Sequence, residues 1–134
     1  MIIATVAAIL LFFGASDSDG LFGTLMTKYA EDPIKNTILD EARRGLALEK
    51  LSVLKDDINE FNKQSAEDIE QFSKLIKNYE SSPEDFNKLF SSMMTKRQEE
   101  VSKIWDARGA MLEHIQPEEW KTIISSAKSA AQEK

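Results

Sequence analysis

The sequence predicts an all-α fold, with a short apolar N-terminal helix followed by a three- to four-helix antiparallel bundle or a hairpin of long helices. Three observations support this prediction. Apolar side chains recur three and four residues apart between positions 34 and 127. No run of residues alternates with the period of two that a strand requires. The 134 residues contain only three prolines and five glycines, as expected for long helices joined by short turns.

The N-terminus is an unbroken apolar run without a charge, residues 2–15. As a helix it would extend about 21 Å, against roughly 30 Å for the hydrocarbon core of a bilayer. This length suits a signal peptide, although no basic residue precedes the run. Three interpretations stay open: an uncleaved membrane anchor, a removed signal peptide, and a buried segment of a soluble core. The predicted membrane contacts are Ile2, Ile3, Val6, Ile9, Leu10, Phe12 and Phe13.

The chain divides into three parts on this basis. We expect residues 1–15 to be the signal peptide or membrane anchor, residues 16–32 a linker or interfacial segment, and residues 33–134 the helical domain. Apolar residues at helical spacing between 21 and 29 could lie at a membrane interface or pack on the domain. Because acids follow the apolar run and Lys28 is the first basic residue, the bulk of the chain is expected outside the cytoplasm. It would face the periplasm or exterior from an anchor, or be exported to the periplasm.

The helical domain has clear start signals. Asp32 and Pro33 predict the first helix, with the aspartate as its cap. Between 33 and 80 the pattern fits one helix or two, and the polar stretch at 62–65 favours two with a bend there. Ser82 before Pro83 predicts the next helix, running to about residue 115, and Pro117 begins the last one.

Composition and motifs give no support to catalysis. A net charge of −6 argues against nucleic-acid binding. The chain has no cysteine, and His114 is its only histidine, so thiolate chemistry and two-histidine metal sites are excluded within one chain. Neither a glycine-rich phosphate loop nor a nucleophile elbow occurs. We therefore expect no enzyme, no cofactor and no metal.

Two arginines on an apolar stripe are the most informative polar residues. Arg97 and Arg108 share the face of the predicted helix from 83 to 115, and a buried guanidinium without a partner would be costly. Each is expected to reach a carboxylate or helix-end carbonyls, or to extend to the edge. The arginines would fix helix register through an ion pair, or mark a charged spot in a binding groove. The possible partners are Asp40, Glu41, Asp56, Asp57 and Asp68.

Methionines and aromatic residues lie on or beside the same stripe. Such side chains suit an adaptable binding surface, although at helical spacing they more often form a plain core. The candidate protein-binding or register-fixing residues are Phe86, Phe90, Met93, Arg97, Trp105, Arg108, Met111 and Trp120.

The stretch from Arg108 to Trp120 resembles the L-T-P-E-Q region of the Spy/CpxP-like family. Those proteins are periplasmic and all-helical, and they include chaperones and envelope-stress or metal-resistance sensors. Pro117 and Glu118 match the motif, Ile115 takes the place of the leucine, and Gln116 and Glu119 replace threonine and glutamine. The match is confined to residues 108–124, and no second copy of the motif occurs. The resemblance implies an extracytoplasmic helical binding protein, while the lack of cysteine and the single histidine count against metal sensing.

These observations lead to two functional expectations. The first is an extracytoplasmic, membrane-anchored or exported helical module that binds proteins, with chaperone-like or envelope-stress work as one version. The alternative is a structural accessory subunit of a larger membrane complex, in which Ala4, Ala7, Ala8 and Gly14 permit close approach of membrane helices. The expected partners are proteins and a membrane contacted through the N-terminus, and a homodimer is compatible with either expectation.

Overall fold

The computed structural model describes residues 22–133, which form helices joined by short breaks and turns, with no strand among them. The helices are η2, a π-helical segment (Leu25–Tyr29), α3 (Glu31–Thr37), α4 (Glu41–Lys77), α5 (Pro83–Leu112) and α6 (Pro117–Gln132). The all-α prediction is confirmed for this part of the chain. The apolar run 2–15 lies outside the described residues, so the N-terminal helix and its membrane contacts stay predictions.

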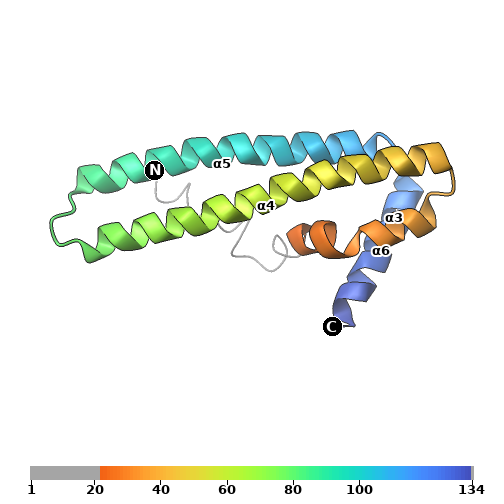
Figure 1. The fold of residues 1–134 in the computed structure, drawn as a ribbon, viewed down its shortest axis with the longest axis horizontal. Helices are drawn as coiled ribbons and strands as arrows, with labels where there is room; N and C mark the ends of the chain where they lie inside the picture. The colour runs from red at the N-terminus through yellow and green to blue at the C-terminus, as the bar shows by residue number, and fades with distance from the viewer. Residues whose placement is uncertain (1–21, 134) are drawn as a thin grey trace.

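Helices α4 and α5 form a long antiparallel hairpin, closed by a turn at residues 78–82 (Figure 1). The shorter elements η2, α3 and α6 contact one another and lie at the opposite end of the hairpin from this turn. We call η2, α3 and α6 the third layer. The half of the hairpin next to the turn, residues 62–98, has no third layer among the described residues, and we call it the distal half.

The helix boundaries follow local capping chemistry. The Ser82 hydroxyl accepts from the backbone N–H of Asp85 at 3.2 Å, and the Asp85 carboxylate accepts from the Ser82 N–H at 2.9 Å. This reciprocal box, with Pro83 in the first turn, begins α5 as predicted. The hydrogen bonds from Ser82 also hold the pKa of Asp85 below its usual value. Pro117 likewise opens α6 as predicted.

The predicted bend at residues 62–65 is wrong, because α4 runs through them without a break. The Ser65 hydroxyl donates to the Phe61 carbonyl one turn earlier, at 2.9 Å, so this polar side chain is satisfied inside the helix. The break comes earlier, at residues 38–40, where Asp40 caps α4. Asp32 does not act as a cap, since α3 already begins at Glu31.

The core joins the third layer to the hairpin. Leu25 and Met26 of η2 are buried in it, so the segment before residue 33 packs on the helical domain, one of the two alternatives left open by the sequence. The largest fully buried side chains are Met26, Ile34, Ile38, Leu51, Leu54, Met111 and Ile123. Every element of the third layer therefore contributes to one apolar core with the adjoining half of the hairpin.

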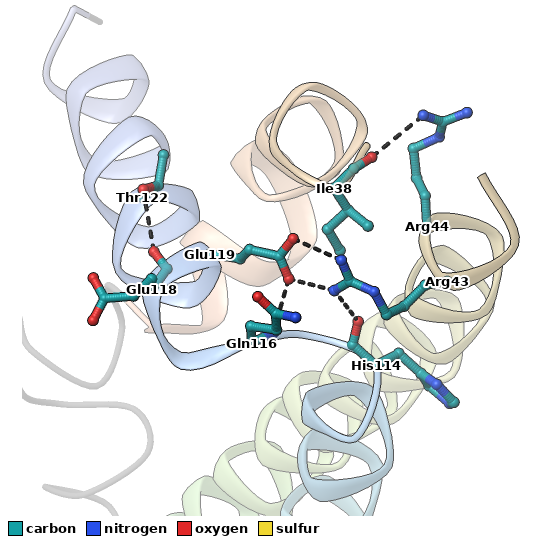
Figure 2. Close-up of polar contacts among 8 residues, drawn as sticks. All are labelled: Ile38, Arg43, Arg44, His114, Gln116, Glu118, Glu119 and Thr122. Carbon is teal, nitrogen blue, oxygen red and sulfur yellow. Dashed lines mark hydrogen bonds and ion pairs between the residues drawn. The ribbon is translucent and has the colours of Figure 1, made fainter. Parts of the chain in front are cut away.

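An ion pair fixes the start of α6 to α4 (Figure 2). The guanidinium of Arg43 donates to both carboxylate oxygens of Glu119, with the Nη2–Oε2 distance at 2.9 Å, and to the His114 carbonyl at 3.1 Å. The Glu119 carboxylate also accepts from the Gln116 N–H at 2.9 Å. The hydrogen bond from Arg43 is the main reason why the pKa of Glu119 is held below its usual value. The Pro-Glu-Glu turn is thus tied to α4.

Candidate functional site

One apolar stripe on α4 changes from buried to exposed along its length. Leu51, Ile58, Ile69 and Ile76 are seven, eleven and seven residues apart, close to whole helical turns, so they point in about the same direction. Leu51 and Ile58 are 1% and 5% exposed, whereas Ile69 and Ile76 are 63% and 60% exposed. The stripe continues into the distal half, whereas the third layer that buries its first part does not extend that far among the described residues.

The cover ends beside Ile58, as three contacts along α4 show. Arg44 donates to the Ile38 carbonyl, Lys55 pairs with Glu31, and a Cβ placed on Gly23 would lie 3.7 Å from Ile58 Cγ2. Residues 38 to 23 thus run antiparallel to α4, and the earlier a residue is in this segment, the closer it lies to the distal half. The described residues begin at Phe22, one position before Gly23, so nothing described covers Ile69 and Ile76.

Three phenylalanines pack together between the helices of the distal half. The Phe72 ring of α4 meets Phe86 edge-on, with centroids 6.0 Å apart, and lies 5.7 Å from Phe90. All three rings are only half-buried. Met94 is half-buried one turn beyond Phe90 on α5. We call Ile69, Phe72, Ile76, Phe86, Phe90 and Met94 the distal face. It contains no charged residue, and its composition is that of a binding surface or a core without its cover.

A buried ion pair lies where the distal half meets the rest of the hairpin. Arg97 of α5 and Asp68 of α4 are 3% and 2% exposed, and Arg97 Nη2 lies 3.3 Å from Asp68 Oδ2. Arg97 also donates to the Ser65 hydroxyl and lies over the Phe61 ring, 4.8 Å from its centroid. One α5 side chain thus contacts three positions spread over two turns of α4. Asp68 is one of the carboxylates predicted as partners of Arg97. We expect the pair to fix the register of the hairpin.

Glu100 lies beside this pair, and its carboxyl is partly buried. Burial raises the pKa of the Glu100 carboxyl, against the opposing attraction of Arg97, and its Oε2 atom has no hydrogen-bond partner among the described residues. A carboxyl whose pKa is raised in the folded state weakens the fold above that pKa. The penalty fades as the pH falls through the folded pKa and is gone below the unfolded value of 4.5.

We therefore expect Glu100→Gln to stabilise the protein in a pH-dependent way. The free energy of unfolding should rise by about 1 kcal/mol at neutral pH, because a buried acceptor no longer carries a charge without a partner. The gain should vanish near pH 3, well below the unfolded value of 4.5, where wild-type Glu100 is protonated in both states. Urea denaturation at the two pH values measures this. A loss of stability at neutral pH would mean that the attraction between Glu100 and Arg97 outweighs the burial penalty.

The candidate residues from the sequence separate into two groups on α5. Phe86, Phe90, Met93 and Arg97 lie in the distal half, whereas Trp105, Arg108 and Met111 lie near the third layer. Met93 and Met111 are buried, at 6% and 0% exposure, so both are core residues.

Of the alternatives predicted for the arginines on this stripe, Arg108 fits extension to the edge of the helix and not an ion pair. Its guanidinium lies 5.5 Å from the centroid of the Trp105 ring and 5.8 Å from that of the Trp120 ring. Arg108 is half-buried, so solvent reaches part of the group and stacking on the two indoles covers the rest. Its contacts join α5 to α6.

The α4 contribution to the candidate surface was not predicted as a site. Ile69, Phe72 and Ile76 belong to the apolar pattern of α4, and the pattern alone makes them core residues. Their exposure depends on where the third layer ends along α4. The spacing of apolar residues in the sequence does not predict this end point. The Arg43 pair with Glu119 was also missed, because its partners are 76 positions apart in the sequence.

Comparisons with protein-family models, with curated proteins and with solved structures each gave no match. Within residues 22–133, no helix has both the length and the apolar character needed to cross a bilayer. The same residues contain no group of three or more histidine, aspartate or glutamate side chains placed to hold a metal ion.

Proposed function

We propose that the protein is a helical protein-binding module, held at a membrane or exported through its apolar N-terminus, and that it binds partners through the distal face. Its leading version is chaperone-like: the face takes apolar segments of unfolded proteins outside the cytoplasm. The observation that carries the proposal is the exposure of Ile69 (63%) and Ile76 (60%) beside three half-buried phenylalanine rings. The resemblance of residues 108–124 to the Spy/CpxP-like family favours the extracytoplasmic setting.

The design of the hairpin suits this role. An apolar surface without charges binds through the hydrophobic effect, which is not directional and so accepts varied partners. Long side chains such as Met94 and phenylalanine rings adapt to differently shaped apolar segments. Below the face, the buried Arg97–Asp68 pair holds α4 and α5 in one register, so the surface stays in place while partners exchange.

The test is a double substitution, Ile69→Asp with Ile76→Asp, in the full chain. Burying each isoleucine against a partner is worth roughly 1.5 kcal/mol, so the pair should weaken partner binding by about 3 kcal/mol, or about a hundredfold in Kd. The measurement is light scattering from a reduced, aggregating client protein, with and without the variant. Wild type should slow aggregation, and the double variant should not.

A matched control is present on the same helix. Leu46 and Val53 are also seven residues apart on α4, are 43% and 47% exposed, and lie on the side away from the distal face. Leu46→Asp with Val53→Asp adds the same two charges and should leave client protection unchanged. Equal loss in both variants would attribute the effect to charge and would contradict the proposal. Stoichiometric co-purification with one membrane complex, and no effect on clients, would identify the accessory-subunit alternative instead.

A further inference from the structure

The third layer leaves the distal face uncovered at the point where the described chain begins. The contacts of Ile38 and Glu31 with successively later residues of α4, and the position of Gly23 beside Ile58, bring the chain to the last covered residue of the stripe, about 17 Å along α4 from Ile69. Twenty-one residues precede Phe22, and the first part of them is the apolar run 2–15. The chain therefore holds an uncharged apolar segment tethered beside an uncharged apolar face.

We propose that residues 2–13 are the occupant of the distal face when no membrane and no partner is present. In that state, Ile69 and Ile76 are covered by the side chains of this segment, which extends the third layer along the hairpin. External partners then have to displace a segment of the same chain. This regulatory consequence rests on the proposed function of the face, whereas the occupancy itself does not.

The tether has the required reach. Residues 14–21 can span up to about 27 Å when extended. Along α4, the rise from Ile58 is about 17 Å to Ile69 and about 27 Å to Ile76. Residues 2–13 can therefore lie beside either isoleucine.

Tethering also favours this occupant over a second copy or a free client. A segment joined by a short linker acts at an effective concentration in the millimolar range, far above that of a separate protein. The chemistry matches on both sides, since residues 2–13 carry eight large apolar side chains and no charge. A bilayer competes for those same side chains, so the membrane-anchored state would be the state in which the distal face is free.

The absence of cysteine allows a direct test, because two introduced cysteines give only one possible disulfide within a chain. Ile9→Cys is combined with Ile76→Cys in the full-length protein without membranes. The control combines Ile9→Cys with Lys74→Cys, two positions earlier on α4 and on its other side. We expect oxidation to close the first pair about tenfold faster than the second, because docking raises the local concentration at one side of the helix only.

Mass spectrometry and gel mobility separate the outcomes. Equal rates for the two pairs would overturn the occupancy, and disulfides between chains with a concentration-dependent rate would assign the face to a second copy. The oxidised Ile9–Ile76 protein is then tested for client protection. If it protects clients as well as its reduced form does, occupancy stands and the proposed function of the face fails. If the pair shows no preference while Ile69→Asp with Ile76→Asp still abolishes protection, the occupancy fails and the proposed function stands.

Discussion

Replacing Asp68 by alanine is expected to lower the free energy of unfolding by about 3 kcal/mol or more, because it leaves a buried guanidinium without its counter-charge. Arg97 is only 3% exposed, and its remaining direct contacts are a hydroxyl and an aromatic ring, with the partly buried Glu100 carboxyl nearby but not hydrogen-bonded to it. Neither group neutralises its charge. Thermal and urea denaturation of the full chain, followed by circular dichroism at 222 nm, are the measurements.

A double replacement separates the value of the pair from the cost of breaking it. Arg97→Met combined with Asp68→Leu replaces both charges by apolar groups of similar length, and should restore most of the stability lost in Asp68→Ala. The control is Glu70→Ala, which breaks the exposed pair between Lys74 and Glu70 and should cost about 0.5 kcal/mol or less. If Asp68→Ala were as mild as this control, the pair would not set the register of the hairpin.

Truncating Ile38 to alanine is expected to cost about 3 kcal/mol, through lost apolar burial and the cavity left behind. Ile38 lies in the three-residue break between α3 and α4 and is 0% exposed. Its side chain is part of the core that joins the third layer to the hairpin, so the loss should be felt first in η2, α3 and α6. Hydrogen exchange should show faster opening of these elements than of the α4–α5 hairpin.

Leu39, the next residue, is a matched control for this truncation. It is 84% exposed, and Leu39→Ala removes a side chain of the same size from the same turn. Its effect on the free energy of unfolding should stay within about 0.5 kcal/mol. Similar losses at the two positions would mean that the break at 38–40 is stabilised by backbone conformation and not by the burial of Ile38.

Local chemistry is what made parts of the fold predictable. The starts of α5 and α6 were correct because Ser82, Pro83 and Pro117 act within a few residues of where they stand. The predicted break at 62–65 was wrong because polar composition alone does not end a helix: Ser65 bonds back to Phe61, and Asp68 finds Arg97 across the hairpin. The partner of Arg97 was within the predicted set, whereas the stacking of Arg108 on two indoles was not anticipated.

The sequence by itself determined that residues 34–127 form amphipathic helices, because apolar spacing and capping are properties of the chain over one or two turns. Only the tertiary structure decided which part of each apolar stripe is covered. Ile58 and Ile69 are equally apolar and lie on one stripe, yet one is 5% and the other 63% exposed. The difference arises because burial depends on what a distant segment places beside a residue, and the described third layer ends between the two.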